Sequence, residues 1–142
     1  MSRDSVDVLV LGASGPIGLA LGRRANMHGL TVFATGRRGP NAVDATDSVA
    51  LAQVMRATTP RAVVNLVNPA DAGDSGLASV IARTVAESAG QGRVGRLVFF
   101  SWAAVYGDEG VRPYIESDQL RGASTYARGK ILSEEALMRT AA

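Results

Sequence analysis

Apolar runs alternate with segments of helical periodicity along most of the chain. The apolar runs are bounded by glycine, proline or polar residues and predict β-strands at residues 6–11, 31–35, 62–67 and 96–101, with a short strand near 42–43. The segments between and after them carry apolar residues three and four positions apart and predict helices at residues 17–28, 47–57, 77–88 and 124–140. Asp47 fits the N-cap of the second helix, and residues 107–122 are predicted to form a long loop.

The order of these elements predicts an α/β fold with a doubly wound parallel sheet of about five strands. Strands that are apolar on both faces need helices on both sides, and an alternation of strands with helices provides them. The chain has 142 residues, of which 46% are hydrophobic, so it has the size and composition of one domain. We therefore expect a single domain over residues 1–142.

Charge and composition exclude several classes of function. Fifteen Lys and Arg residues against 13 Asp and Glu give a formal charge of +2, and the basic residues form no continuous run, so nucleic acid is not an expected partner. No apolar stretch approaches the ~20 residues of a membrane span, and no signal-peptide core opens the chain. A cytoplasmic protein without a membrane partner is expected. Because cysteine is absent and His28 is the single histidine, no metal site is predicted.

A glycine-rich turn joins the first predicted strand to the first predicted helix. Gly12, Gly15 and Gly18 lie three positions apart, where a turn must be tight, a backbone must approach a ligand, and a helix must pack closely on a strand. The helix would direct its unpaired N–H groups and the positive end of its dipole at bound phosphates. Since the turn lies between a strand and an amphipathic helix, it predicts a site for the pyrophosphate of a nicotinamide dinucleotide. The other predicted contacts of this turn are Ser14, Pro16 and Ile17.

Two arginines follow the second predicted strand, where the adenosine ribose of such a cofactor would lie. An acidic residue at this point binds the 2′-hydroxyl of NAD, whereas a basic one accepts the 2′-phosphate of NADP. Arg37 and Arg38 are found there, and residues 31–40 contain no carboxylate. Two guanidinium groups can grip a phosphate, although a solvated basic turn is the competing interpretation. NADP is the predicted cofactor, with Arg37 as its main contact, and NAD is less favoured.

Further motifs are spread nearly end to end along the chain. Besides the glycine turn they comprise residues 43–47, 63–67 and 97–108 and the Tyr-x-x-x-Lys pattern of residues 126–130. Together they resemble the short-chain dehydrogenase/reductase family, in particular its extended branch of epimerases and dehydratases. The resemblance implies a Rossmann-type, NAD(P)-binding domain in which Asp44 meets the adenine. The other cofactor contacts that it implies are Ala45, Asn65, Leu66 and Val67.

Tyr126 and Lys130 lie four positions apart on the last predicted helix and therefore share one face of it. A phenol has a pKa of ~10, and a nearby ammonium favours its deprotonated form, which suits Tyr126 for general acid/base catalysis. The resemblance implies that Tyr126 exchanges a proton with the substrate hydroxyl while hydride moves to or from the cofactor. The alternative interpretation is that Tyr126 and Lys130 are an ordinary exposed tyrosine and lysine on a surface helix. Glu134 and Glu135 further along this helix are interpreted as surface charges.

The chain departs from the family pattern at the catalytic serine or threonine. The family carries that hydroxyl four positions before the tyrosine of its Val-Tyr-Gly turn, and here that position holds Trp102. An indole donates one hydrogen bond and cannot accept one. Ser101 replaces the hydroxyl only if the backbone has already turned, because neighbouring side chains of a strand point to opposite faces. The predicted catalytic residues are Tyr126, Lys130 and Ser101.

The chain is also shorter than the family pattern. Family members usually add two strands and a substrate-binding portion after the helix that carries the tyrosine, and this portion is lacking here. The strand at residues 96–101 would then form an apolar sheet edge, which natural proteins cover or pair. We expect a homo-oligomer, or a complementing chain that pairs at this edge.

The leading hypothesis is an NADP-dependent enzyme of the short-chain dehydrogenase/reductase type. Its substrate would be a small molecule with a carbonyl or hydroxyl group, such as a nucleotide sugar or a secondary metabolite. One alternative is an accessory subunit that kept the dinucleotide fold but lost redox chemistry, as Trp102 suggests. Another is a non-redox isomerase, lyase or cyclase that reuses the pocket for proton transfer.

Overall fold

The computed structural model of the chain describes residues 5–68, 75–108, 110 and 112–141. The chain forms two compact units. The sheet unit comprises residues 1–68 and 84–100, and the C-terminal unit comprises residues 69–83 and 101–142. The single domain expected from the sequence stays a prediction.

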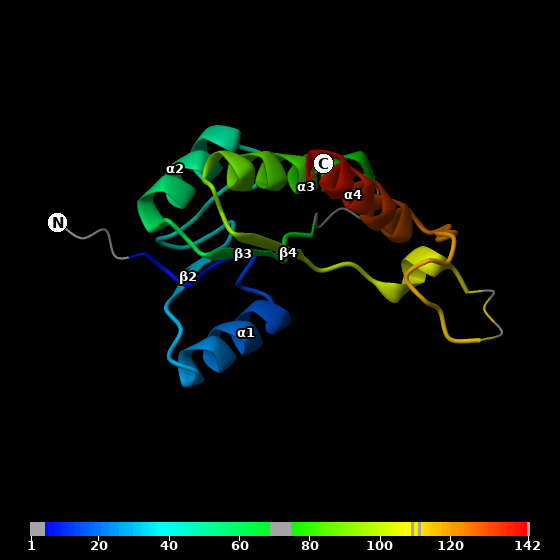
Figure 1. Cartoon of the computed structure of the whole chain (residues 1–142), viewed down its shortest axis with the longest axis horizontal. Helices are drawn as coiled ribbons and strands as arrows, with labels where there is room; N and C mark the ends of the chain where they lie inside the picture. Colours follow the sequence, from blue (N-terminus) through cyan, green and yellow to red (C-terminus); the bar gives the residue numbers. More distant parts are fainter. Residues whose placement is uncertain (1–4, 69–74, 109, 111, 142) are drawn as a thin grey trace. The chain divides into compact units, whose positions relative to one another are not determined.

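A parallel sheet forms the centre of the sheet unit (Figure 1). The chain starts in the middle of the sheet, moves to one edge, and then returns across the first strand to the other side. This is the doubly wound arrangement that the sequence predicts. In one row of the register, Leu9 lies between Phe33 and Val63. The strands are β1 (Val8–Leu11), β2 (Val32–Thr35), β3 (Ala62–Asn65) and β4 (Arg96–Phe99), in the order β2-β1-β3-β4.

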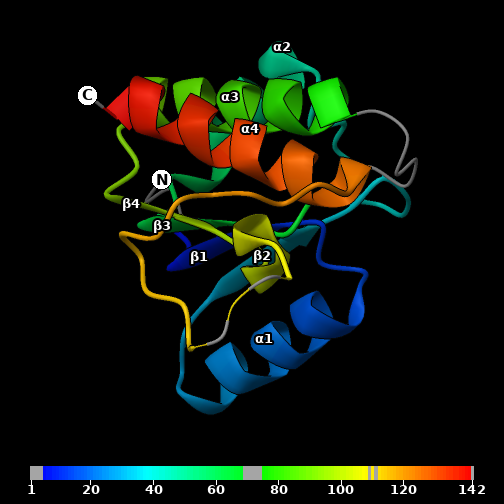
Figure 2. The ribbon, with the colours of Figure 1, turned by 90° about the vertical axis from the view of Figure 1, so that its right-hand side faces the viewer.

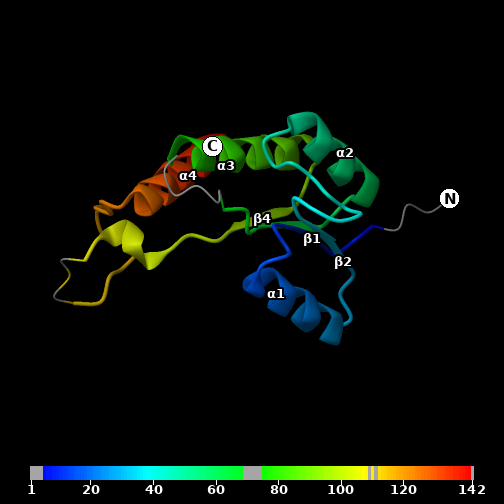
Figure 3. The ribbon, with the colours of Figure 1, turned by 180° about the vertical axis from the view of Figure 1, so that it is seen from behind.

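Helices cover both faces of this sheet. Helix α1 (Pro16–Met27) lies on one face, and helix α2 (Ser48–Thr58) lies on the other, together with the part of α3 (Ser75–Gln91) that belongs to the sheet unit (Figures 1 and 3). This placement explains why the strands are apolar on both sides. Within the described residues, no helix is both long and apolar enough to cross a membrane.

Apolar side chains fill both interfaces between the sheet and its helices. On the α1 face, Val10, Val64 and Ala13 form a buried cluster against which Leu21 of α1 packs. Because side chains alternate along a strand, the neighbours of Val10 and Val64 point to the opposite face. Burial of each large apolar side chain stabilises the fold by about 1.5–3 kcal/mol. The fully buried side chains of that opposite face are Leu9, Leu11, Leu51, Met55, Val63 and Val85.

The C-terminal unit contains a 3-10 helix, η1 (Ala103–Tyr106), and a long helix, α4 (Thr125–Ala141), joined by a loop (Figure 2). The loop returns to η1 immediately before α4 begins. The N–H of Gly122 donates to the carbonyl of Val105 at 2.8 Å, and a Cβ at Gly122 would lie 2.5 Å from the carbonyl oxygen of Ala104. Only glycine fits this approach, so Gly122 fixes the start of α4 against η1.

The sheet has four strands among the described residues, where the sequence predicts about five. The expected strand near residues 42–43 is an isolated parallel bridge between Gly36 and Ala42. The backbone turns before pairing can continue, since Gly39 has a φ of +98° and the N–H of Ala42 donates back to its carbonyl at 3.2 Å. The N-cap prediction is confirmed: the carboxylate of Asp47 accepts two N–H bonds of the first turn of α2, at 2.9 and 3.0 Å.

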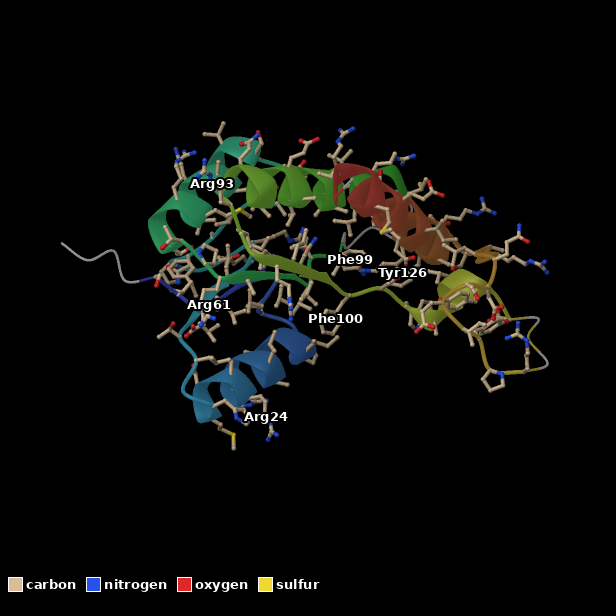
Figure 4. The ribbon with its side chains drawn as sticks, viewed as in Figure 1. Arg24, Arg61, Arg93, Phe99, Phe100 and Tyr126 are labelled. Atoms are coloured by element: carbon tan, nitrogen blue, oxygen red, sulfur yellow. The ribbon has the colours of Figure 1, made fainter. Side chains whose placement is uncertain are left out.

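Strand β4 is an edge strand of the sheet within the described part of the chain, because it pairs only with β3. The side chain of Val98 is 36% exposed, and Phe100, two positions further, is 40% exposed on the side that α1 covers (Figure 4). An apolar, partly exposed edge of this kind favours association with another strand. Pairing with a second copy or with a complementing chain stays a prediction.

We expect the chain to self-associate at high concentration, and Val98→Glu to reduce the association because it places a charge beside the edge. Size-exclusion chromatography with light scattering measures the mass. Val49→Glu on α2 is the matched control, since Val49 is exposed and lies outside the sheet. A wild-type chain that stays monomeric at high concentration would contradict the prediction.

Candidate functional site

The turn between β1 and α1 begins at a glycine that the backbone requires. Gly12 has a φ of +78°, a conformation that L-residues rarely adopt. A Cβ at Gly12 would also lie 3.0 Å from the backbone of Leu66, just beyond β3. The next N–H, that of Ala13, donates to the carbonyl of Thr35 at 2.8 Å. The turn is therefore held between the carboxyl ends of β2 and β3.

Gly15 and Gly18 meet very different surroundings. A Cβ at Gly18 would lie 2.5 Å from the Cα of Ala13, so α1 can pack on the turn only if residue 18 is glycine. A Cβ at Gly15 would meet none of the described residues within 4 Å, and its φ of −81° suits any residue. The fold thus explains Gly18, whereas Gly15 leaves open space beside the backbone.

The N-terminus of α1 faces this open space without a side-chain cap. Gly15 is the N-cap residue, no side-chain oxygen among the described residues caps the helix, and its first turn contains no acid. Pro16 begins the helix and gives up an N–H that would be unpaired there. The remaining N–H groups and the positive end of the helix dipole are suited to an anion.

The end of β2 approaches the same turn. A Cβ at Gly36 would lie 3.4 Å from the hydroxyl oxygen of Ser14. Arg37 and Arg38 follow and are exposed. The sequence predicts all three polar residues as cofactor contacts, and the structure brings the turn and the arginine segment together.

Asp44, predicted to meet the adenine, is held by its own loop. Its carboxylate accepts bonds from the N–H and hydroxyl of Thr46 at 2.8 and 2.7 Å. These bonds, together with the positive charge of Arg37, hold the pKa of Asp44 below its usual value. Asp44 therefore stays ionised at neutral pH, and the next residue, Ala45, is buried.

The segment after β3 lies against the glycine turn. The N–H of Leu66 donates to the carbonyl of Leu11 at 2.9 Å, and the side-chain oxygen of Asn65 accepts from the N–H of Val67 at 3.0 Å. The side-chain nitrogen of Asn65 is buried and has no hydrogen-bond partner among the described residues. The three residues predicted here as cofactor contacts thus lie at one place, at the carboxyl end of the sheet.

In the C-terminal unit, Tyr126 and Lys130 share one face of α4. The Nζ of Lys130 lies 5.7 Å from the centre of the Tyr126 ring. Only 6% of the surface of Lys130 is exposed. Burial lowers the pKa of its ammonium, and the negative charge of Glu134 opposes that shift. The predicted pair is therefore a phenol beside a buried amine.

Trp102 and Ser101 contact this helix at two different points. The indole of Trp102 lies edge-on to Tyr126, with ring centres 5.2 Å apart and an interplanar angle of 71°. More than half of Trp102, 54%, is exposed. The hydroxyl of Ser101 donates a short hydrogen bond to the carboxylate of Glu134. The structure thus gives Ser101 a partner that the sequence analysis does not anticipate, and its predicted catalytic role stays a prediction.

Glu134 is the residue that the sequence analysis underestimates. It is half-buried and accepts a hydrogen bond from the Ser101 hydroxyl, whereas its neighbour Glu135 is exposed and forms a 3.7 Å ion pair with Arg139. The signal was present in the spacing, because Glu134 continues the four-residue series that begins with Tyr126 and Lys130.

The loop between η1 and α4 lines an open pocket of about 230 Å³. The rings of Tyr106 and Tyr114 stack with centres 5.1 Å apart. Arg112 makes two bonds to the carboxylate of Asp118, at 2.6 and 2.9 Å, and they lower the pKa of Asp118. The ring stack thus joins the loop to η1, and the ion pair joins two of the loop's own residues. The lining residues are Tyr106, Gly110, Arg112, Tyr114, Asp118, Gln119 and Arg121.

Comparison with known proteins identifies the family. Residues 8–142 match the model of the NAD dependent epimerase/dehydratase family, so the chain belongs to this family. It therefore belongs to the extended branch of the short-chain dehydrogenases/reductases. A search of curated proteins finds no match.

Several solved structures share the fold. The UDP-glucose 4-epimerase of Brucella ovis in complex with NAD is 22% identical, with a TM-score of 0.84, and the match covers 96% of this chain and 48% of that one. The Thermus thermophilus UDP-glucose 4-epimerase complex with NAD is 26% identical, with a TM-score of 0.81 and coverage of 93% and 50%. A short-chain dehydrogenase/reductase superfamily protein from Agrobacterium tumefaciens with bound NAD is 26% identical, with a TM-score of 0.78 and coverage of 92% and 43%. The chain spans about half the length of these structures.

The contrast between two glycines of α1 gives a direct test of the turn. We expect Gly18→Ala to lower the free energy of unfolding by about 1–3 kcal/mol, because the new methyl group overlaps the backbone of Ala13. Gly22→Ala is the matched control, since a Cβ there meets none of the described residues within 4 Å; we expect it to stabilise the helix by about 0.5–1 kcal/mol. Urea unfolding measures both, and equal effects would contradict the geometry.

Proposed function

We propose that this chain is an NADP-dependent enzyme of the short-chain dehydrogenase/reductase type that acts on a carbonyl or hydroxyl group. The substrate would be a small molecule such as a nucleotide sugar or a secondary metabolite. The observation that supports this most strongly is the turn between β1 and α1. Gly12 and Gly18 are required by the fold, but Gly15 leaves open space in front of an uncapped helix N-terminus.

The chemistry of this turn fits the pyrophosphate of a dinucleotide. A ligand backbone can approach Gly15 closely, the N–H groups of the first turn of α1 can donate to phosphate oxygens, and that turn contains no acid to repel them. The Brucella and Thermus epimerase structures are complexes with NAD. When bound, the nicotinamide ring would supply a hydride donor or acceptor.

The end of β2 favours NADP over NAD in this proposal. Arg37 and Arg38 are exposed beside the turn, where the hydroxyl of Ser14 also lies. Charge-assisted bonds from guanidinium groups to a 2′-phosphate would add affinity that NAD cannot gain. The positive charge of Arg37 helps to lower the pKa of Asp44, but the Asp44 carboxylate is hydrogen-bonded to Thr46.

Tyr126 would exchange the proton of the substrate hydroxyl. The Nζ of Lys130 lies 5.7 Å from the centre of the Tyr126 ring, and a positive charge there would stabilise the phenolate that forms when the proton leaves. Trp102 stands where the family has a hydroxyl, so the proton would pass through Tyr126 without a serine or threonine beside it. The exposed indole would form an apolar wall that orients the substrate and excludes water.

We expect the intact chain to bind NADPH more tightly than NADH. Arg37→Ala should weaken NADPH binding by about tenfold or more, because it removes a charge-assisted bond, while NADH binding stays the same. Fluorescence or calorimetric titration measures both ligands. Arg24→Ala is the matched control, because Arg24 is an exposed arginine in the last turn of α1 (Figure 4).

Gly15→Ala separates binding from folding in the same titration. A methyl group there meets none of the described residues within 4 Å, so stability should be retained while both nucleotides bind weakly. If wild type binds neither nucleotide, the proposed function fails. If NADH binds as tightly as NADPH, the assignment of NADP fails and the fold-level assignment remains.

We expect Tyr126→Phe to lower the rate of hydride transfer by about 10²–10⁴-fold, since it removes the proton donor, while NADPH affinity is unchanged. The assay follows oxidation of NADPH against a panel of UDP-sugars and simple carbonyl compounds. Tyr114→Phe is the matched control, because the Tyr114 hydroxyl bonds the carbonyl of Gly107 in the loop. Full activity in Tyr126→Phe would remove Tyr126 from the mechanism.

The second candidate is a protein that binds the dinucleotide but performs no net redox chemistry, either as an accessory subunit or as an isomerase, lyase or cyclase. The replacement of the family hydroxyl by Trp102 favours it. Tight NADPH binding without hydride transfer to any member of the panel would support this candidate over the first.

A further inference from the structure

One face of α4 carries a charged series longer than the Tyr-x-x-x-Lys pattern. Tyr126, Lys130 and Glu134 are spaced four apart and lie one above the next along the helix. The segment that follows β4 contacts both ends of this series. Trp102 packs edge-on against Tyr126, and the hydroxyl of Ser101 donates to Glu134.

The middle member of this series, Lys130, is nearly fully buried. An ammonium that loses water is unstable unless charge or hydrogen bonds compensate, and otherwise it releases its proton. The carboxylate of Glu134 supplies an opposing negative charge. Residues 101–102 bring no titratable group. The other titratable groups in the described part of the C-terminal unit are Arg83 on α3, Tyr106 on η1, Asp108, Arg112, Tyr114, Glu116, Asp118 and Arg121 in the loop, and Arg128, Glu135 and Arg139 on α4.

We propose that Glu134 is a positioning residue that keeps the buried Lys130 protonated beside Tyr126, with the Ser101 hydroxyl fixing its carboxylate in place. This inference rests on the proposed function, because Glu134 would act on the acid/base pair of Tyr126 and Lys130 that is proposed there. Glu134 acts through Lys130 and touches no substrate. Without its charge, Lys130 would become neutral at a lower pH, and Tyr126 would lose the ammonium that favours its phenolate.

Glu135 shows why this is more than an ordinary surface charge. It is the adjacent residue on the same helix, yet it is exposed and pairs with the equally exposed Arg139 at 3.7 Å. Such a pair is screened by water and contributes little. Glu134 is half-buried, is bonded by a hydroxyl, and acts on an amine that has been removed from water. Glu135 is therefore the matched control.

Trp102 provides a readout that needs no substrate. It is the one tryptophan of the chain, and its ring centre lies 5.2 Å from that of Tyr126. A tyrosinate absorbs the light that tryptophan emits, so ionisation of Tyr126 should quench Trp102 fluorescence. A pH titration of the full chain should show one quenching step that is lost in Tyr126→Phe and retained in Tyr114→Phe.

We expect Glu134→Gln to raise the midpoint of this step, because a neutral Lys130 would no longer place a positive charge beside the phenolate. Lys130→Met should raise it at least as far, and the double variant should not exceed Lys130→Met, since both act through one ammonium. Glu135→Gln should leave the midpoint unchanged. A direct effect of Glu134 on Tyr126 would instead lower the midpoint, because it removes a negative charge.

An unchanged or lowered midpoint in folded Glu134→Gln overturns the proposal. If thermal melting shows that this variant does not fold, Glu134→Asp and Ser101→Ala test the proposal in its place. Both keep the negative charge at position 134 but fix the carboxylate less firmly. We expect each to raise the midpoint by less than Lys130→Met does, and no rise in either overturns the proposal.

The outcome is separable from that of the proposed function. NADPH titration of Glu134→Gln should give the wild-type affinity, because Glu134 lies outside the residues proposed to bind the cofactor. A wild-type chain that binds no dinucleotide would refute the proposed function and leave the fluorescence midpoints able to test Glu134. Once a reacting substrate is found, Glu134→Gln should shift the pH profile of kcat in the same direction as the midpoint.

Discussion

The close approach of α1 to the turn that precedes it determines the geometry of the sheet unit. At Gly18 the helix lies so near the backbone of Ala13 that a methyl group cannot fit between them. This contact fixes where α1 starts and how it lies on Val10 and Val64. It also fixes the direction in which the unpaired N–H groups of the first turn point. The placement of the anion-binding groups therefore depends on a packing contact that touches no ligand.

Sequence patterns predicted a doubly wound parallel sheet, because the strands are apolar on both faces and alternate with helices along the chain. The short strand near Ala42 was not realised because Gly39 adopts a left-handed conformation that apolar periodicity does not reveal. The glycine spacing located the turn, but the contacts that require glycine at positions 12 and 18, and not at 15, are seen only in the folded structure. The spacing shows where the glycines are, but it does not show which atoms a larger side chain at each position would contact.

The C-terminal unit was harder to anticipate. A four-residue interval placed Tyr126 and Lys130 on one face, and the structure agrees. The burial of Lys130 and the bond between Ser101 and Glu134 depend on tertiary contacts that no local pattern encodes. In the sequence, Glu134 looks like any other acidic residue on an amphipathic helix. Its hydrogen bond to Ser101, in the segment after β4, distinguishes it in the structure. The side chains that determine the electrostatics of a site are thus harder to predict from the sequence than those expected to perform its chemistry.

The open space at Gly15 has an evolutionary consequence. Folding constrains Gly12 and Gly18 in every descendant of this chain, whether or not it keeps a ligand, whereas only a ligand gives selection a reason to retain Gly15. A lineage that abandoned nucleotide binding would be free to drift at this one position while the flanking glycines persisted. The residue at position 15 would then record whether ancestral binding has been kept or lost.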